Sequence, residues 1–307
     1  MTKYVVSGYI GFDNFGDEAI AHVLIDKLRK EGAEKITLIS SNPEKTSQIH
    51  EVESCGMFKF LKPIIEADVL ISGGGSLLQD VTSFRSLLYY LIVIFTALIL
   101  GKRVEIYAQG IGPIKSFWGK ILTRMALKSA DKISVRDKAS QDLLNSWKID
   151  SELVQDPIFS LNLPQKNQKG IVGIQLRNFK GVDSDFLSKL AKVIKNRFAD
   201  KEIQILSLQD SVDLKICEFF KTILEQNGLR AKIFNNLSMD EVLEKISDLE
   251  YLIGMRFHSN VVGIKSGVKT LCINYDPKVK KLAEEYNLPC INLDDEDFSE
   301  EFDKLTK

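Results

Sequence analysis

The chain has 307 residues, of which 44% are hydrophobic and 27% are charged, and its formal net charge is −1. This composition is typical of a folded globular protein and excludes a disordered or fibrous chain. Basic and acidic residues are interspersed, which argues against a nucleic-acid-binding protein, because such proteins show a basic face or tail. The length exceeds that of a usual single core, so we expect two domains of about 150 residues each.

The first half of the chain alternates apolar strands with helices. The predicted strands are 3–10, 35–40, 68–72, 103–109 and 132–135. The predicted helices are 17–30, 86–100, 117–129 and 139–147, with a further polar helix after Asn42 and Pro43. Since strand and helix alternate throughout, this half is expected to form a parallel, doubly wound sheet.

One predicted helix, residues 86–100 (SLLYYLIVIFTALIL), is apolar along its whole length. It has only 15 residues before Gly101-Lys102-Arg103, whereas a membrane span needs about 20. A buried core helix is therefore favoured. A helix that lies in a membrane surface stays open as the alternative.

The polar segment 162–170 (NLPQKNQKG) is the best candidate for a linker, because it combines Pro and Gly with polar residues. It places the domain boundaries at 1–163 and 164–307. After it the alternation restarts, with predicted strands at 171–176, 203–208, 231–234, 251–255, 270–275 and 290–293. Helices are predicted at 183–198, 212–227, 239–247 and 277–287, one follows strand 251–255, and the acidic tail 294–307 is predicted to be a surface helix. Two such α/β halves are expected to face each other across a ligand-binding cleft.

The cysteines indicate whether a metal site is present, and the N-terminal sequence indicates the cellular location. The four cysteines show no CxxC spacing and no nearby histidine pairs, so no metal site is expected. The N-terminal sequence MTKYVVSGYIGFDN lacks the layout of a signal peptide. We therefore expect a cytoplasmic protein.

Two loops of the first domain follow predicted strands and are rich in glycine. The first, Gly11 to Asp17, does not fit the dinucleotide pattern GxGxxG. Asn14 and Asp17 there predict either a substrate loop or a simple turn and helix cap. The second loop contains Gly73, Gly74, Gly75 and Ser76, and no Gly-Lys-Ser/Thr follows as in a P-loop.

Three consecutive glycines need a reason, because ordering them has a high entropic cost. Close approach of a ligand or of the opposing chain to Gly74, Gly75 and Ser76 is the favoured one. Asp80, four residues beyond Ser76, is either a catalytic carboxylate or a cap or ion-pair residue.

Cations follow several predicted strands. Arg256 and His258 lie where strand 251–255 meets a helix start, and such a place binds ligands and suits an anion. Arg136 and Lys278 also follow strands, so a cationic cluster for a phosphate and a carboxylate is predicted. The alternatives are that Arg256 caps a neighbouring carboxylate and that His258 merely packs. For Arg136 they are an ion pair with Asp137 or a surface position, and for Lys278 a solvated position on its helix.

Six motifs in order, GYIGFDNFGDEAI, ISGGGSLLQD, AQGIGPI, SVRD, GMRFHSNVVG and NYDPKV, resemble the polysaccharide pyruvyl transferases. The likeness spans about residues 5 to 287 and is close to the type that acts on bacterial cell-wall polymers. It implies a GT-B-like pair of Rossmann domains, with the acceptor side in the first and the phosphoenolpyruvate side in the second. The family often has Leu between the Arg and His of GMRFH, where this chain has Phe257.

The resemblance implies transfer of the pyruvyl group of phosphoenolpyruvate to two hydroxyls of a sugar, N-acetylmannosamine in the cell-wall type, with release of phosphate. Phosphoenolpyruvate is then a co-substrate, and no cofactor or metal is expected. The partners are a glycan or lipid-linked sugar and no nucleic acid, with membrane contact at the inner face as an option and the oligomeric state open. Arg136, Arg256, His258 and Lys278 are implied in donor binding, with His258 as general acid and then base.

Asp17 and Asp80 are the predicted residues for binding or deprotonating the acceptor hydroxyls. Two rival functions remain at this stage. One is a nucleotide-sugar glycosyltransferase on the same two-domain scaffold, and the other is a non-catalytic relative that binds ligand without releasing phosphate.

Overall fold

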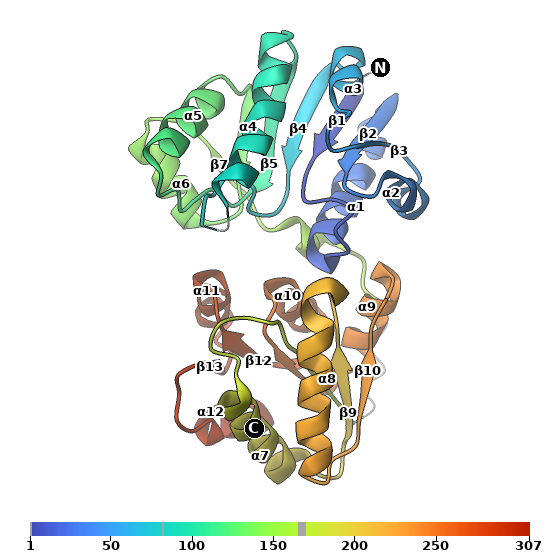
Figure 1. Ribbon diagram of the computed structural model, residues 1–307, viewed down its shortest axis with the longest axis vertical. Helices are drawn as coiled ribbons and strands as arrows, with labels where there is room; N and C mark the ends of the chain where they lie inside the picture. Colours follow the sequence, from blue (N-terminus) through green and yellow to red (C-terminus); the bar gives the residue numbers. More distant parts are fainter. Residues whose placement is uncertain (1, 82, 165–169) are drawn as a thin grey trace. The chain divides into compact units, whose positions relative to one another are not determined.

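The computed structural model describes residues 2–81, 83–164 and 170–307, and its ribbon is drawn in Figure 1. The chain divides into two compact units, one ending at Leu161 and the other beginning at Asn162. The predicted boundary after residue 163 lies close to this division. The cleft between two domains stays a prediction.

Unit 1 is built on a parallel sheet whose described strands follow the order β3-β2-β1-β4-β5-β6-β7. The strands are β1 (Lys3–Ser7), β2 (Lys35–Ser40), β3 (Glu53–Gly56), β4 (Val69–Gly73), β5 (Arg103–Gln109), β6 (Lys132–Val135) and β7 (Glu152–Leu153). The helices are α1 (Phe15–Lys30), α2 (Pro43–His50), α3 (Leu61–Glu66), α4 (Phe84–Ile99), α5 (Phe117–Lys128), α6 (Lys138–Ser146) and the 3-10 helix η1 (Pro157–Ser160). The reversal of strand order beside β1 and β4 places the carboxyl ends of these two strands at the switch point of the sheet, where ligands bind in such folds.

The two faces of this sheet have separate apolar cores. Helix α1 covers one face, where Leu24 and Ile25 pack with Val6, Leu38 and Ile71 of the strands. Helices α3, α4 and α5 cover the other face, with side chains such as the following in one cluster: Ile64, Leu87, Leu91, Ile94, Val104, Ile106 and Leu127. The predicted doubly wound sheet is confirmed for this unit.

Unit 2 has a second parallel sheet, with its described strands in the order β10-β9-β8-β11-β12-β13. The strands are β8 (Ile171–Gln175), β9 (Glu202–Leu206), β10 (Ala231–Phe234), β11 (Tyr251–Gly254), β12 (Lys269–Asn274) and β13 (Cys290–Asn292). The helices are α7 (Ser184–Phe198), α8 (Asp210–Gln226), α9 (Met239–Ser247), α10 (Phe257–Lys265), α11 (Pro277–Glu285) and α12 (Ser299–Thr306). Strand β11 lies between β8 and β12, so the carboxyl ends of these three strands are neighbours.

Helix α4 is the apolar segment that the sequence predicted as a buried core helix. One face of it is buried, with Leu87, Leu91 and Ile94 almost fully enclosed, but Leu88 and Ile92 on another face are exposed. The prediction is therefore correct for one face only. Among the described residues, no helix is both long enough and apolar enough to cross a membrane.

Several short elements were not predicted, namely β3, α3, β7 and η1. Strand β1 also ends at Ser7 and not at residue 10. Strand β3 (ESCG) has no apolar alternation, and α3 (LKPIIE) is short and contains a proline, so neither carries the periodicity on which such predictions depend. The C-terminal helix α12 lies at the surface as predicted, with Glu300 and Lys304 exposed, and it buries Phe302 and Leu305 in the core of unit 2.

Candidate functional site

Arg256 lies at the end of β11 and is held by residues from two other elements. Its Nε and Nη2 donate to the two carboxylate oxygens of Asp213 at 2.7 Å each, and Nη2 also donates to Gln209 Oε1 at 2.9 Å. The side chains of Arg256 and Asp213 are only 7% and 0% exposed. The backbone N–H of Arg256 donates to Gln175 Oε1 at 2.6 Å, which fixes the start of α10 against the end of β8. A buried ion pair with this many hydrogen bonds holds the guanidinium in one orientation.

The third nitrogen of this guanidinium, Nη1, makes no hydrogen bond to the part of the chain that the structure describes. This nitrogen is also not fully enclosed, so it can be reached from outside. Arginine carries donors on all three nitrogens in one plane. Arg256 therefore keeps N–H donors available for an anion while Asp213 fixes the rest of its side chain.

His258 follows in the first turn of α10. Its ring is half-buried and meets the ring of Phe257 edge-on, with centroids 5.2 Å apart. The turn that carries it is tight: Asn260 Nδ2 donates to the Gly254 carbonyl at 3.1 Å, and a Cβ at residue 254 would lie 1.9 Å from Asn260 Oδ1. Ser259 Oγ donates to the Arg256 carbonyl at 2.7 Å. Glycine at 254 is thus required for the turn that presents Arg256 and His258.

Lys278 lies in the first turn of α11, beyond the end of β12. Its backbone N–H donates to Asp276 Oδ1 at 3.0 Å, and Asp276 is the N-cap of that helix. The Lys278 ammonium is 3.8 Å from Asp276 Oδ2, and both side chains are more than a third exposed. Such a long, exposed pair is weak, so the lysine can turn to another anion.

Arg177 is a further cation at this edge of the sheet, and the sequence reasoning missed it. It follows β8 by two residues, and its backbone N–H donates to Met255 Sδ at 3.3 Å, directly before Arg256. Its guanidinium lies over the ring of Tyr275, 5.7 Å from the centroid. Its Nε is enclosed and has no hydrogen-bond partner among the described residues. The signal that found Arg256, a cation just after a buried strand, applied to Arg177 as well.

In unit 1, Asn14 and Asp17 lie together at the start of α1. Asn14 is the N-cap: its side-chain Nδ2 donates to Asp17 Oδ2, and its side-chain Oδ1 accepts from the Gly16 N–H at 3.3 Å. The preceding loop is held by Glu18, which accepts from the Gly11 N–H at 2.7 Å and contacts the buried His50 ring at 2.9 Å. The cap alternative is therefore confirmed for Asn14, and a role of Asp17 toward an acceptor stays a prediction.

The glycine run after β4 packs closely against α1. A Cβ at residue 74 would lie 2.3 Å from Ile20 Cγ2, and one at residue 75 would lie 2.7 Å from Asp17 Oδ1. Both glycines have a positive φ, 70° and 65°. Close approach of the chain itself thus accounts for these glycines, and it brings Gly75 against the carboxylate of Asp17. Nearby, burial and then the charge of Asp17 raise the pKa of Tyr90.

Arg136 is paired inside unit 1. Its Nη1 lies 2.6 Å from Asp156 Oδ2, with the two side chains 6% and 4% exposed, and Nη2 donates to Ser76 Oγ at 3.1 Å. The alternative of an ion pair with Asp137 is wrong, because Arg136 pairs with Asp156 and Asp137 caps α6 by accepting from the Ser140 N–H at 2.8 Å. The structure places Arg136 and Ser76 together in unit 1, whereas Arg256, His258 and Lys278 belong to unit 2.

Asp80 holds the loop that leads into α5. Its two oxygens accept from the backbone N–H groups of Lys115 and Ser116, each at 2.7 Å. Burial raises the pKa of the Asp80 carboxyl, but the hydrogen bonds from Ser116 and Lys115 outweigh it, so the pKa lies below its usual value. A carboxylate held in this way is a weak base, which favours the cap alternative for Asp80.

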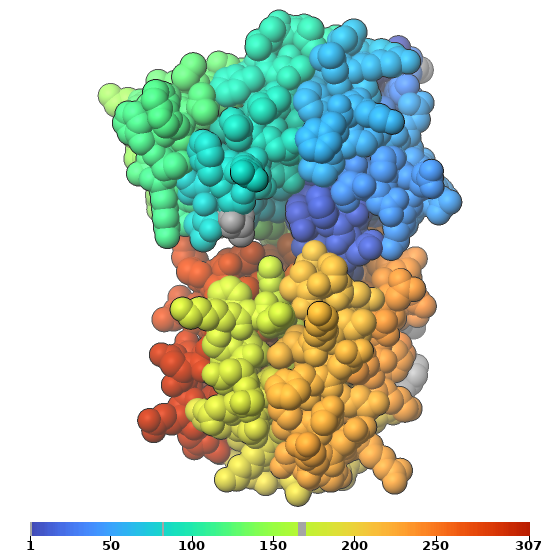
Figure 2. Space-filling model, in the orientation of Figure 1, coloured from blue at the N-terminus to red at the C-terminus, as the bar shows by residue number. Residues whose placement is uncertain are grey.

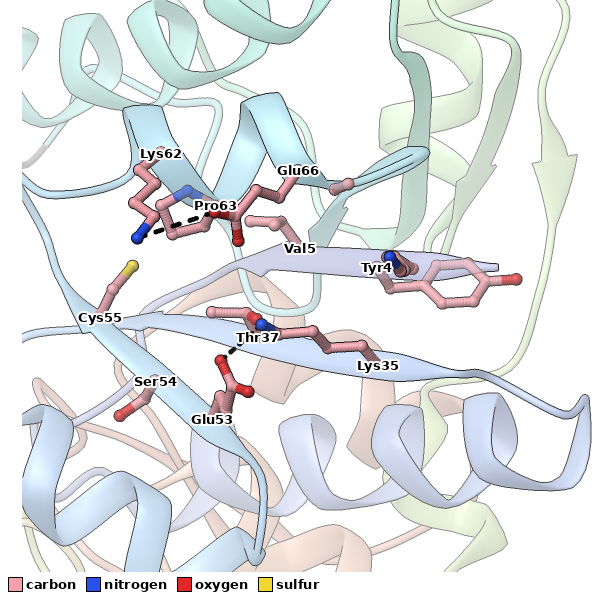
Figure 3. A pocket seen from close by; sticks show the side chains of 12 residues that line it. Tyr4, Val5, Lys35, Thr37, Glu53, Ser54, Cys55, Lys62, Pro63 and Glu66 are labelled. Atoms are coloured by element: carbon pink, nitrogen blue, oxygen red, sulfur yellow. Dashed lines mark ion pairs between the residues drawn. The ribbon is translucent and has the colours of Figure 1, made fainter. Parts of the chain in front are cut away.

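One pocket lies elsewhere in unit 1, at the amino ends of β1, β2 and β3 beside α3 (Figure 3). It has a volume of about 210 Å³, and its charged side chains are paired: Lys35 with Glu53 at 2.8 Å, and Lys62 with Glu66 at 3.8 Å. None of the predicted site residues lines it. Ligands of parallel sheets bind at the opposite, carboxyl edge, so this pocket carries no part of the site.

A sequence model of the family described as polysaccharide pyruvyl transferase matches residues 14–277. This match covers most of the chain. The chain belongs to the polysaccharide pyruvyl transferase family. The resemblance seen in the six motifs is thereby confirmed, and the chain is a pyruvyltransferase of polysaccharide biosynthesis with a sugar or glycan as acceptor. A search among curated proteins finds no match.

Solved structures show what fold this pyruvyltransferase shares. The UDP-GlcNAc 2-epimerase of Methanocaldococcus jannaschii has a TM-score of 0.69 at 13% identity, with 100% of this chain and 92% of that chain covered. The MnaA–UDP structure of S. aureus has a TM-score of 0.69 at 10% identity, covering 100% and 88%. HepE of Anabaena with UDP and glucose has a TM-score of 0.65 at 11% identity, covering 99% and 89%. These likenesses confirm the predicted GT-B-like pair of Rossmann-like domains and concern the fold alone.

Proposed function

We propose that this pyruvyltransferase takes phosphoenolpyruvate as donor and binds it at the carboxyl ends of β8, β11 and β12. The observation that carries the proposal is the guanidinium of Arg256, fixed by Asp213 and still holding N–H donors on Nη1. Arg177 on one side and Lys278 on the other add two cations from the neighbouring strands. Phosphoenolpyruvate carries a phosphate and a carboxylate, and such a row of cations suits both. No cofactor or metal enters the proposal.

The chemistry requires a proton donor near the bound enol. His258 donates a proton to the methylene carbon, which leaves an oxocarbenium-like centre at C2. A first sugar hydroxyl adds to C2, and its proton passes to the phosphate. The C2–O bond to phosphate then breaks with its electron pair on that oxygen, so hydrogen phosphate leaves and C2 becomes oxocarbenium-like again. A second hydroxyl of the same sugar then adds to C2 and closes the ketal, and its proton passes to His258 as base. Arg256 beside it neutralises the phosphate as that group leaves.

The acceptor in this proposal is a sugar of a cell-wall polymer precursor, N-acetylmannosamine by resemblance, presented as a lipid-linked intermediate at the inner face of the membrane. Asp17, hydrogen-bonded by Asn14 and facing Gly75 at the carboxyl ends of β1 and β4, is the residue in unit 1 best placed to accept a hydrogen bond from a sugar hydroxyl. Arg136 positions Ser76 in the same loop.

The direct test is to incubate the protein with phosphoenolpyruvate and a panel of N-acetylhexosaminyl lipids and to search by mass for the ketal. Formation of the ketal in deuterated water with one deuterium in the methyl group would establish protonation of the enol. The variant His258→Gln should then bind phosphoenolpyruvate but lose turnover. Equal turnover of this variant would remove His258 from the proton transfer.

A nucleotide-sugar reaction is the second candidate, and what favours it is that solved structures in complex with UDP or UDP-glucose share this fold. The two candidates differ in the ligand that stabilises unit 2. Thermal shift with phosphoenolpyruvate against UDP-sugars separates them. Stabilisation by UDP-sugars alone, with no response to phosphoenolpyruvate, would contradict the donor proposed here.

A further inference from the structure

The exposed apolar side chains of this protein are concentrated on one part of unit 1. Sixteen large apolar side chains of the described residues are exposed, and twelve of them lie between residues 58 and 125. Helices α3, α4 and α5 fall in this range, and α4 contacts both of the others. We call the exposed side of these three helices the α3–α5 surface. Figure 2 shows their segments side by side on unit 1, in blue, teal and green.

The centre of the α3–α5 surface is a stripe along α4. Phe84, Leu88, Ile92 and Ile99 are 40%, 37%, 46% and 84% exposed. Their spacing of four, four and seven residues puts them on one side of the helix. The opposite side of α4 packs into the core of unit 1, so this stripe is a second apolar face on the same helix.

The flanking helices widen this stripe. On α5, the rings of Phe117 and Trp118 meet edge-on at 5.5 Å and are 70% and 65% exposed. On the α3 side, Phe58 is 88% exposed and lies against Tyr89 of α4, with ring centroids 6.0 Å apart. Gly119 lets α5 approach α4, because a Cβ there would lie 3.1 Å from Leu87. Exposed apolar side chains therefore occur on α4 and beside it on both of the helices that it contacts.

The charges around this surface have a single sign on α4 and α5. No Asp or Glu occurs from Val81 to Val104 or from Ile106 to Ala130. The same two segments contain seven basic residues: Arg85, Lys102, Arg103, Lys115, Lys120, Arg124 and Lys128. On α3, Glu66 is paired with Lys62. The whole chain has a net charge of −1, so this local excess of cations is a property of the surface and not of the composition.

We infer that the α3–α5 surface docks unit 1 onto an anionic lipid bilayer. Exposed Phe, Trp and Leu side chains enter the headgroup region, and the surrounding lysines and arginines meet the anionic headgroups. Aromatic rings such as those of Phe117 and Trp118 are favoured at that depth. A second copy of the chain would bring its cations against these cations, which disfavours a symmetric dimer through this face. The inference rests on this surface and does not depend on the donor chemistry.

The test is cosedimentation of the full chain with vesicles, without donor or acceptor. Vesicles of phosphatidylcholine that contain phosphatidylglycerol should bind the protein, and pure phosphatidylcholine vesicles should bind it at least about tenfold more weakly, since several cations contribute. The double variant Phe117→Ser/Trp118→Ser should bind about tenfold more weakly or worse, because two apolar side chains no longer enter the lipid. The pair Lys120→Gln/Lys128→Gln should weaken binding and reduce its dependence on salt.

The control is Phe219→Ser, which removes an aromatic ring of unit 2 that is 46% exposed and should leave vesicle binding unchanged. Absence of binding, or equal binding to both kinds of vesicle, would overturn the inference. A second result would also overturn it: the protein forms a dimer in sedimentation velocity, Phe117→Ser/Trp118→Ser is a monomer, and neither protein binds vesicles. Folding of every variant is checked by circular dichroism.

Discussion

The side chain of Arg256 is fixed by residues that are distant in the sequence. Asp213 and Gln209 come from the start of α8, and Gln175 comes from the end of β8. The motif around Arg256 indicated an anion site, but no local pattern showed which acidic residue would hold the guanidinium. That partner is selected by the sheet, which places β11 beside β8.

We expect Asp213→Ala to lower the free energy of unfolding of unit 2 by about 3–5 kcal/mol, because it leaves a buried guanidinium without its counter-charge. The measurement is urea unfolding followed by far-UV circular dichroism. Lys278→Ala, which removes only an exposed pair, should change the free energy by less than about 0.5 kcal/mol. Equal effects of the two variants would contradict the structural role given to Asp213.

Arg177→Ala is expected to raise the KM for phosphoenolpyruvate about tenfold or more with a smaller effect on kcat, since it removes charged hydrogen-bond donors from the site proposed for that substrate. Initial rates at varied donor concentration give both constants. Arg230→Ala, an exposed arginine before β10, is the matched control and should leave KM unchanged. An unchanged KM for Arg177→Ala would exclude this residue from donor binding.

The Asp80 carboxyl predicts how the free energy of unfolding depends on pH. Its pKa in the folded protein lies below the unfolded value of about 3.9. Its carboxylate therefore stabilises the fold above that unfolded value, and the contribution disappears as the pH falls through the folded pKa. The difference in unfolding free energy between the protein and Asp80→Asn should be constant above about pH 5 and shrink below about pH 4. A difference in unfolding free energy that grows as the pH falls would contradict a folded pKa below the unfolded value.

Among the elements, the glycine run after β4 was correctly predicted to allow close approach, but the approaching group was not identified. Three glycines in a row did indicate close approach, but the approaching group at Gly74 is Ile20 of α1. Sequence alone does not say which helix covers a strand end. Buried strands and amphipathic helices were predicted well because each is long enough to show a hydrophobic period. Strands β3 and β7 and helix α3 have too few residues to show one, so they were not predicted.

Gly74→Ala and Gly101→Ala separate backbone strain from packing. Both glycines have positive φ, 70° and 66°, but only residue 74 would place a Cβ against another side chain, whereas nothing lies within 4 Å at residue 101. Gly101→Ala should cost about 1–2 kcal/mol of unfolding free energy. Gly74→Ala should cost about 1–3 kcal/mol more, and Ile20→Ala in the same chain should recover part of that excess. Equal costs for the two glycine variants would show that the contact with Ile20 is unimportant.

For the whole molecule, the apolar clusters of unit 1 share no residue with those of unit 2. The alternation of strands and helices predicted two α/β halves because each half repeats the pattern in full. Family membership rests on motifs from both units, which is why the combination was far more specific than any one of them.

Separate cores predict separate unfolding transitions. Both tryptophans, Trp118 and Trp147, belong to unit 1, so tryptophan fluorescence follows that unit alone. Asp213→Ala in unit 2 should shift the transition seen by circular dichroism to lower urea and leave the fluorescence transition in place. A parallel shift of both signals would show that the units unfold as one cooperative block.

The ion pair of Arg256 with Asp213 also has a thermodynamic consequence for binding. A free arginine side chain loses rotamer freedom when it grips an anion, and this loss weakens binding. In this protein the loss occurs when unit 2 folds, because Asp213 already orders the guanidinium. An anion that binds here therefore meets a guanidinium that is already ordered. The entropy cost of ordering this side chain lowers the free energy of unfolding and does not weaken the binding of the anion.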